Sequence, residues 1–190
     1  ITARATLDLV RIDKAERISV TGCSGLSLRN GVQISNSDDC AVSGNAFEAC
    51  SARGVYANEG SNRIAITGNA IRNTAEHCVE VNGGGVYTIT GNNLSLPASG
   101  KSNIYIGGGT TGLVGHNVGN GASLASHIRV TGSASYYSLM SNHFQGTSAA
   151  ALIIDAGCDN VLYDANRWAG TGKTVTDGGS NSVVGTNWAT

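Results

Sequence analysis

Short apolar stretches separated by polar turns repeat along this chain with a period of 20 to 26 residues. The clearest copy reads IAITGNAI at 64–71, then a short polar turn, then VEVNGG at 79–84. Apolar and polar residues alternate inside each stretch, which is the period of a β-strand and not of an α-helix. The pattern therefore predicts many short strands and no amphipathic helix.

The repeat contains two phrases. The first reads apolar-x-apolar-x-Gly-Asn-x-apolar, and the second reads apolar-x-apolar followed by small turn residues. A repeat of ~23 residues fits one winding of three short strands and three turns, and such windings stack in parallel register roughly 4.8 Å apart. The sequence thus predicts an all-β parallel β-helix of about eight coils, with the second phrase at 7–9, 32–34, 55–57, 79–81, 104–106, 128–130, 152–154 and 174–176.

Equivalent positions of the first phrase are expected to stack as columns. The apolar position after the Asn should build the core through Phe47, Ile71, Leu94, Val118, Phe144, Trp168 and Trp188. The Asn position should form a ladder of hydrogen-bonded amides at a tight bend, where Asn tolerates the left-handed backbone conformation. Its predicted members are Asn45, Asn69, Asn92, Asn142 and Asn166, with Cys23, His116 and Thr186 in the remaining copies.

The Ile-Thr-Gly-Asn phrase with its Asn ladder resembles the right-handed parallel β-helix superfamily, which includes pectate-lyase-like enzymes and bacteriophage tailspikes. The resemblance covers about residues 6 to 188. It implies a right-handed, single-stranded parallel β-helix, and the closest likeness is to a β-helix segment of a phage tailspike or tail fibre. One such scaffold carries many activities, so the motif predicts architecture far better than function.

The composition limits the kinds of partner that we expect this chain to bind. The net charge is -1 and only 13% of residues are charged, so we expect neither nucleic acid nor a membrane surface as a partner. Gly accounts for 27 of 190 residues and Pro for 1, which suits turns in a regular repeat. We treat 1–190 as one β-helix domain. Because the chain starts without Met and shows no capping helix at either end, we expect it to be a piece of a longer chain.

The five cysteines are odd in number and form no Cys-x-x-Cys motif, so a disulfide framework is not expected. Their use suits assembly in a reducing cytoplasm. Cys40 aligns with Ile64 of the next copy and should point into the core. His127 aligns with Cys78, but the four histidines do not fall at metal-ligand spacing, and we expect no metal and no cofactor.

Alternation forces the middle residue of each second phrase outward, so these residues should form a row along the coil axis. The row reads Asp8, Gln33, Tyr56, Glu80, Tyr105, Arg129, Ile153 and Val175. Tyr rings can lie against sugar faces, while Glu and Arg can bond hydroxyls and acidic groups. In the resembling enzymes this face forms the saccharide groove, which predicts a carbohydrate-binding set of Tyr56, Glu80, Tyr105, Arg129, His77 and Asn82. Contact with another subunit and no role at all remain open alternatives.

Catalysis would need two carboxylates at a defined separation. Glu80 and Glu59, one coil apart, are the predicted pair, because Asp155 lies too far from Glu80. Asp38 and Asp39 resemble the paired carboxylates of polygalacturonases. The partner motifs of that family, Gly-His-Gly and Arg-Ile-Lys, are missing, which leaves a turn as the simpler interpretation.

These features predict a tailspike-like β-helix segment that binds a bacterial surface polysaccharide, either lipopolysaccharide O-antigen or capsule. A homotrimer in the virion tail, assembled in the host cytoplasm, follows from the same resemblance; an extracellular protein is the alternative. A polysaccharide hydrolase or lyase and a purely structural shaft or adhesin segment are the competing functions.

Overall fold

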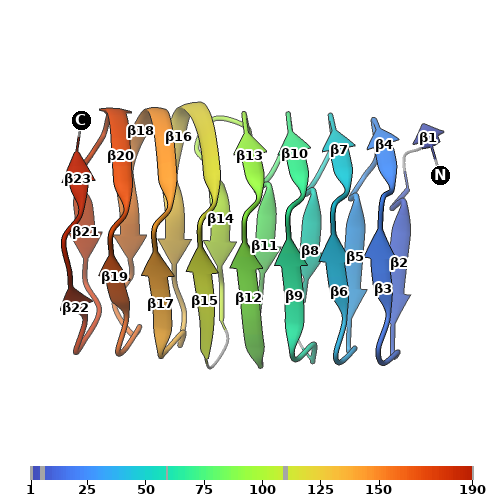
Figure 1. Cartoon of the computed structure of the whole chain (residues 1–190), viewed down its shortest axis with the longest axis horizontal. Coiled ribbons are helices and arrows are strands. Elements are labelled where there is room, and N and C mark those ends of the chain that lie inside the picture. The colour runs from blue at the N-terminus through green and yellow to red at the C-terminus, as the bar shows by residue number, and fades with distance from the viewer. Residues whose placement is uncertain (1, 5–6, 59, 109–110, 190) are drawn as a thin grey trace.

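A computed structural model describes residues 2–4, 7–58, 60–108 and 111–189. The described residues form strands, turns and bends with no helix, and the strands wind as one β-solenoid from one end of the molecule to the other (Figure 1). No helix long and apolar enough to cross a membrane occurs among them. The predicted all-β parallel β-helix is confirmed.

Each winding contributes one strand to each of three faces. The first sheet contains β2 (Val10–Asp13), β5 (Val32–Ser35), β8 (Val55–Ala57), β11 (Val79–Val81), β14 (Ser102–Ile106) and β21 (Val175–Asp177). The second contains β3 (Ser19–Thr21), β6 (Ala41–Ser43), β9 (Ile64–Thr67), β12 (Val86–Thr90), β15 (Thr111–Gly115), β17 (Tyr137–Met140), β19 (Leu162–Asp164) and β22 (Val183–Val184). The third contains β1 (Thr2–Arg4), β4 (Ser24–Leu26), β7 (Ala46–Glu48), β10 (Ala70–Arg72), β13 (Asn93–Ser95), β20 (Arg167–Thr171) and β23 (Trp188–Ala189).

Two long strands, β16 (Val118–Val130) and β18 (His143–Ile154), run through the corner between the third and first sheets. They join these two faces into one 15-stranded sheet, beside the 8-stranded second sheet, within the described residues. All strand pairs recorded are parallel, and Val79 pairs with Val55 on one side and Ile104 on the other. Eight strands in the second sheet agree with the predicted number of coils.

The interior is built from stacked apolar columns, because strand alternation sends the same position of every winding inward. One column runs through Val32, Val55, Val79, Ile104, Ile128 and Leu152, all fully buried. Another contains Phe47, Ile71, Leu94, Phe144 and Trp168, as predicted. Two predicted members are wrong: Val118 is 44% exposed and Trp188 is 50% exposed. The residues that pair with Leu94 and Trp168 are instead Gly119 and Ala189, one position later.

The predicted ladder of Asn45, Asn69, Asn92, Asn142 and Asn166 is present and buried. In each step, Nδ2 of one Asn donates to Oδ1 of the next, as from Asn69 to Asn92 at 3.0 Å. Nδ2 of Asn69 also donates to the Val42 carbonyl at 2.9 Å, and the Asn69 N–H donates to Oδ1 of Asn92 at 2.9 Å. The last of these bonds satisfies the Asn69 N–H, which the bend would otherwise leave buried and unpaired.

The ladder also includes Asn117 and Asn187, so the assignment of His116 and Thr186 was wrong by one residue. A Gly precedes each of those two residues and imitates the Gly-Asn phrase. The left-handed residue is also not the Asn itself but the one before it, with φ near 60° at Gly22, Gly44, Gly68, Gly91, His116, Ser141 and Ala165.

The predicted strand register fails in the first and last windings. Val10-Arg11-Ile12 pairs with Val32-Gln33-Ile34, so Arg11 and not Asp8 begins the outward row. Both apolar-x-apolar phrases at 7–9 and 10–12 satisfy the allowed period, and the pattern could not choose between them. At the other end, Ile153 pairs with Thr176, while Val175 packs against the core.

The cysteines are free, and Cys40, Cys50, Cys78 and Cys158 are buried among apolar side chains, as predicted for Cys40. Burial raises the pKa of the Cys50 thiol to about 11 and that of Cys78 to about 12. These thiols therefore behave as small apolar core residues.

Candidate functional site

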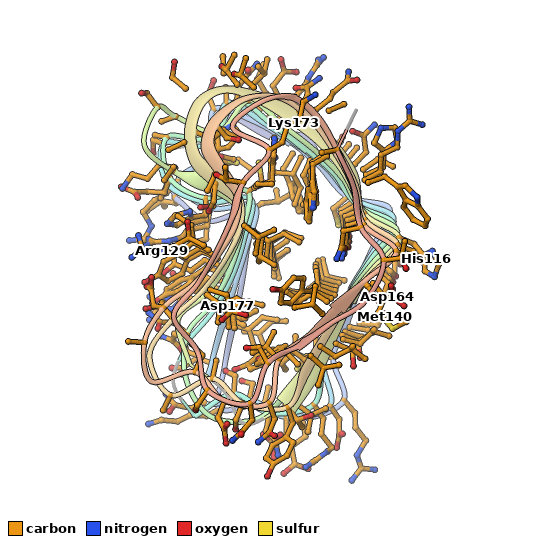
Figure 2. The ribbon with its side chains drawn as sticks, turned by 90° about the vertical axis from the view of Figure 1, so that its left-hand side faces the viewer. His116, Arg129, Met140, Asp164, Lys173 and Asp177 are labelled. Atoms are coloured by element: carbon orange, nitrogen blue, oxygen red, sulfur yellow. The ribbon has the colours of Figure 1, made fainter. Side chains whose placement is uncertain are left out.

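The outer face of the first sheet carries the predicted row. Glu80 pairs with Tyr56 on one side and Tyr105 on the other, and Tyr105 pairs with Arg129. These four side chains lie on successive windings and span roughly 14 Å at the strand spacing. Viewed along the axis, Arg129 stands on the left-hand outer face of the coil, on the opposite side from the His116 corner (Figure 2).

Glu80 points outward yet is only 4% exposed. Arg53, from the turn before β8, covers it: Nε donates to Oε2 at 2.5 Å and Nη2 to Oε1 at 3.4 Å. The same guanidinium lies 4.5 Å from the centre of the Tyr56 ring, a cation–π contact. Glu80 is thus a fixed partner of Arg53 and is closed to an incoming sugar. The other predicted catalytic residue, Glu59, lies outside the described residues.

Tyr105 is held by its neighbours. The His77 ring stacks on it with centroids 4.5 Å apart and planes at 23°. The Ser102 N–H donates to Nδ1 of His77 at 2.9 Å. Burial lowers the pKa of His77 to about 4, so His77 is neutral near pH 7 and accepts this bond.

Asn82 and Tyr105 approach each other over Gly107. A Cβ at Gly107 would lie 2.3 Å from Oδ1 of Asn82 and 2.9 Å from Cε1 of Tyr105, so any larger residue there would push these two side chains aside. The predicted binding set of Tyr56, Glu80, Tyr105, Arg129, His77 and Asn82 is therefore brought together on one face, although Glu80 is covered.

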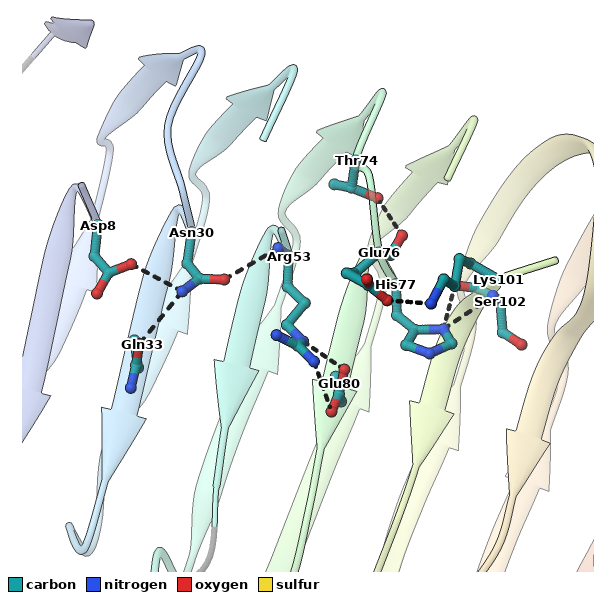
Figure 3. A network of polar contacts seen from close by, with 10 residues as sticks. All are labelled: Asp8, Asn30, Gln33, Arg53, Thr74, Glu76, His77, Glu80, Lys101 and Ser102. Atoms are coloured by element: carbon teal, nitrogen blue, oxygen red, sulfur yellow. Dashed lines mark hydrogen bonds and ion pairs between the residues drawn. The ribbon is translucent and has the colours of Figure 1, made fainter. Parts of the chain in front are cut away.

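Ion pairs between windings lie within the row and beside it. Arg129 donates to Oδ2 of Asp155 through Nε at 3.0 Å and Nη2 at 2.8 Å. Lys101 pairs with Glu76, and this bond lowers the pKa of the Glu76 carboxyl (Figure 3).

The same pattern continues toward the N-terminus. Nη2 of Arg29 pairs with Asp8 at 2.6 Å. Burial acts to raise the pKa of Asp8, but hydrogen bonds from Arg29 and Asn30 outweigh it and lower the pKa. Nδ2 of the buried Asn30 donates to Oδ1 of Asp8 at 2.8 Å, and its Oδ1 accepts the Arg53 N–H at 3.0 Å (Figure 3).

Sequence reasoning placed His77 in the binding set but missed Asn30 and Arg53, which also support the row. A signal was present, because the position two residues before each paired apolar position is polar in successive windings, at Asn30, Arg53, His77, Ser102 and Ser126. This constant offset marks a second polar column beside the row, in which Asn30, Ser102 and Ser126 are buried.

A polar column also lies under this face. Asn103 and His127 are buried, and Nδ2 of Asn103 lies 3.0 Å from Nδ1 of His127. The His127 ring stacks on the Phe144 ring with centroids 5.2 Å apart. Cys78 aligns with them as predicted, its Sγ 3.8 Å from Oδ1 of Asn103. Among the described residues, no group of three or more His, Cys, Asp or Glu side chains forms a metal cluster.

Asp38 and Asp39 lie away from this face. They contact the Arg63 guanidinium at 3.4 Å and 2.5 Å, and Asp39 has φ of 54°, which fits a turn.

A surface groove of about 610 Å³ also lies away from this face. It follows the outer face of β4, β7, β10 and β13, where the small side chains of Ser24, Ala46 and Ala70 leave space. Its charged residues, Glu48 and Arg72, pair with each other at 2.6 Å. The aromatic, amide and charged side chains that neighbouring residues hold in place are on the first sheet, so we place the candidate site there.

Residues 8–94 match the family model described as a right handed beta helix region. No curated protein matches the chain. Among solved structures, the chain is similar to the DFA-IIIase from Arthrobacter chlorophenolicus A6 without its lid, at 13% identity and a TM-score of 0.39. That similarity covers 86% of this chain, which spans 62% of the other. The fold is that of a right-handed parallel β-helix.

Proposed function

We propose that this chain is a tailspike-like β-helix segment that binds a bacterial surface polysaccharide through the outer face of its first sheet. The ligand class is O-antigen or capsule. The observation that carries this proposal is the in-register row of Tyr56, Glu80, Tyr105 and Arg129, with each tyrosine fixed by a stacked neighbour.

Preorganisation supports binding at this row. Tyr56 and Tyr105 are half-buried, two windings apart, and their rings are held by Arg53 and His77. Side chains already held in place lose little entropy when a ligand arrives. Aromatic rings also present broad apolar faces to the C–H faces of sugars and keep a polar hydroxyl at the rim.

Binding without hydrolysis fits this face better than catalysis. A glycosidase needs one carboxyl as acid and a second as base or nucleophile, both open to the sugar. Glu80 is covered by Arg53, and Asp155 is held by Arg129. Release of reducing ends from a polysaccharide, lost in Glu80→Gln, would favour the enzyme alternative instead.

The proposal extends to assembly and location. We place the segment in a homotrimer in the virion tail, because a low-charge β-solenoid rich in Gly, Ser, Asn and Thr suits a tailspike. Sedimentation at high protein concentration tests the trimer, and a monomer there would contradict it. A structural shaft is the remaining alternative, and it predicts high thermal stability with no glycan affinity.

The test is a panel of O-antigen and capsular polysaccharides measured against wild type, Tyr56→Ala and Tyr105→Ala. We expect each variant to lose at least tenfold in affinity, because a stacking face is removed. Tyr136→Ala is the matched control, since Tyr136 is 65% exposed and outside the row. Ala70→Trp fills the groove of the third sheet. Binding that survives both row variants but is lost in Ala70→Trp would overturn the proposed site.

A further inference from the structure

We infer that the stretch of the first-sheet face between Arg29 and Arg129 selects uncharged sugar units over polymers that carry carboxylates. This inference rests on the proposed function and names its ligand class. The sequence suggested that Arg129 binds acidic groups, but the ion pairs of this face lead to the opposite expectation.

Every Lys and Arg described between Arg29 and Arg129 on this face has an acidic partner on a neighbouring winding. The partners are Asp8 for Arg29, Glu80 for Arg53, Glu76 for Lys101 and Asp155 for Arg129. Four cations thus meet four carboxylates. His77 adds no positive charge near pH 7, because its Nδ1 accepts the Ser102 N–H.

An anionic sugar on this face would have to compete for a guanidinium that a carboxylate already holds. The Nε and one terminal nitrogen of Arg129 both point to Oδ2 of Asp155. Arg53 uses the same two nitrogens on Glu80. A further carboxylate would lose its hydration and also approach the existing ones, and like charges placed close together disfavour binding.

Neutral hydrogen-bonding groups remain available between the pairs. Tyr56, Tyr105 and Asn82 are half-buried, and the Tyr105 ring lies beside the Asn82 amide over Gly107. Such groups both donate and accept, which is what a sugar hydroxyl requires. A neutral polysaccharide gains these bonds without a charge mismatch.

The experiment uses polymers that differ only in charge: polygalacturonate, alginate and hyaluronan, each beside its carboxyl-reduced form. Affinities are measured by calorimetry for wild type, Asp155→Asn and Glu48→Gln. In wild type, we expect at least one reduced polymer to bind tenfold or more tightly than its acidic parent. Asp155→Asn frees Arg129, and we expect it to cut that ratio to threefold or less by strengthening binding of the acidic form.

Glu48→Gln is the control, because it frees Arg72 on the third sheet and should leave the ratio unchanged. An acidic form that binds wild type as tightly as its reduced form, with that affinity lost in Tyr105→Ala, would overturn the inference and leave the proposed site intact. A ratio unchanged in Asp155→Asn would overturn it as well. No binding by any polymer, including the panel of surface polysaccharides, would overturn the proposed function and this inference together.

Discussion

Nε of Arg53 donates to Oε2 of Glu80 on the next winding at 2.5 Å, and the carboxylate it holds is almost completely buried. The pair bridges two windings on the face where the row lies. Removing one member leaves a charge without its partner in a place that water barely reaches.

Arg53→Ala should therefore destabilise the fold by about 3 kcal/mol, because breaking a buried ion pair costs on the order of 3–5 kcal/mol and Arg53 is partly exposed. Urea denaturation followed by circular dichroism measures the loss. Arg72→Ala breaks the more exposed pair with Glu48 and should cost less than about 1 kcal/mol. Equal losses in the two variants would contradict this account of Glu80.

The Asn ladder predicts a sharp contrast between two adjacent residues. Asn92→Ala removes four hydrogen bonds, and it leaves the buried Asn69 N–H without the Asn92 oxygen that accepts it. At about 1 kcal/mol for each lost hydrogen bond, with a further cost for the unpaired N–H, we expect a loss of about 3–5 kcal/mol in the free energy of unfolding. Asn93 is exposed, and Asn93→Ala should change that free energy by less than about 0.5 kcal/mol. Similar thermal midpoints for the two variants would argue against the ladder as a stabilising element.

Backbone strain at the residue before the ladder predicts a stabilising change. Ala165 has φ of 54° in a position that Gly occupies in four earlier windings. The left-handed conformation costs a non-Gly residue about 1–2 kcal/mol, and Gly loses about 0.5–1 kcal/mol in unfolded-chain entropy. Ala165→Gly should therefore gain about 0.5–1 kcal/mol, and Gly91→Ala should lose a similar amount. Calorimetric melting of both variants checks the signs, and a destabilised Ala165→Gly would refute the strain argument.

The free energy of unfolding should decrease as the pH is lowered, because two buried histidines resist protonation in the folded state. Burial lowers the pKa of His127 from 6.5 to about 4, and that of His77 to the same value. Between pH 6.5 and 4 the unfolded chain binds more protons than the folded one, so stability present above pH 6.5 is lost as the pH falls through this window. For His127 the loss is on the order of 3 kcal/mol at 1.36 kcal/mol per pKa unit.

The measurement is the free energy of unfolding against pH in wild type and in His127→Asn. The variant is expected to be less stable at pH 7 but to show a shallower slope between pH 6.5 and 4. Parallel curves would show that His127 does not titrate as its burial predicts.

The sequence was sufficient for the architecture because one rule, equal positions stacked in register, covers nearly every residue. The row of Tyr56, Glu80, Tyr105 and Arg129 followed from that rule alone. Where two candidate phrases satisfied the same period, as at 7–9 and 10–12, only the pairing of Val10 with Val32 decides. The slip at His116 has the same cause, since Gly115-His116 imitates Gly91-Asn92.

The sequence pattern could not predict that Glu80 is paired and covered, and the reason is different. Arg53 belongs to a turn and reaches Glu80 across 27 residues of sequence. The conformation of the turn decides which residue Arg53 contacts, and the repeat pattern carries no information about that conformation. Exposure of an outward residue therefore depends on what the neighbouring turn places over it, as Glu80 shows.

Each winding bonds only to the one before and the one after it. Under a pulling force applied between the chain ends, the molecule should therefore peel from its ends one turn at a time instead of rupturing as a whole. Each event would release about 24 residues, or roughly 80 Å of extended chain at 3.3–3.6 Å per residue. A force–extension trace would then show a sawtooth of evenly spaced peaks, because the molecule yields gradually under load.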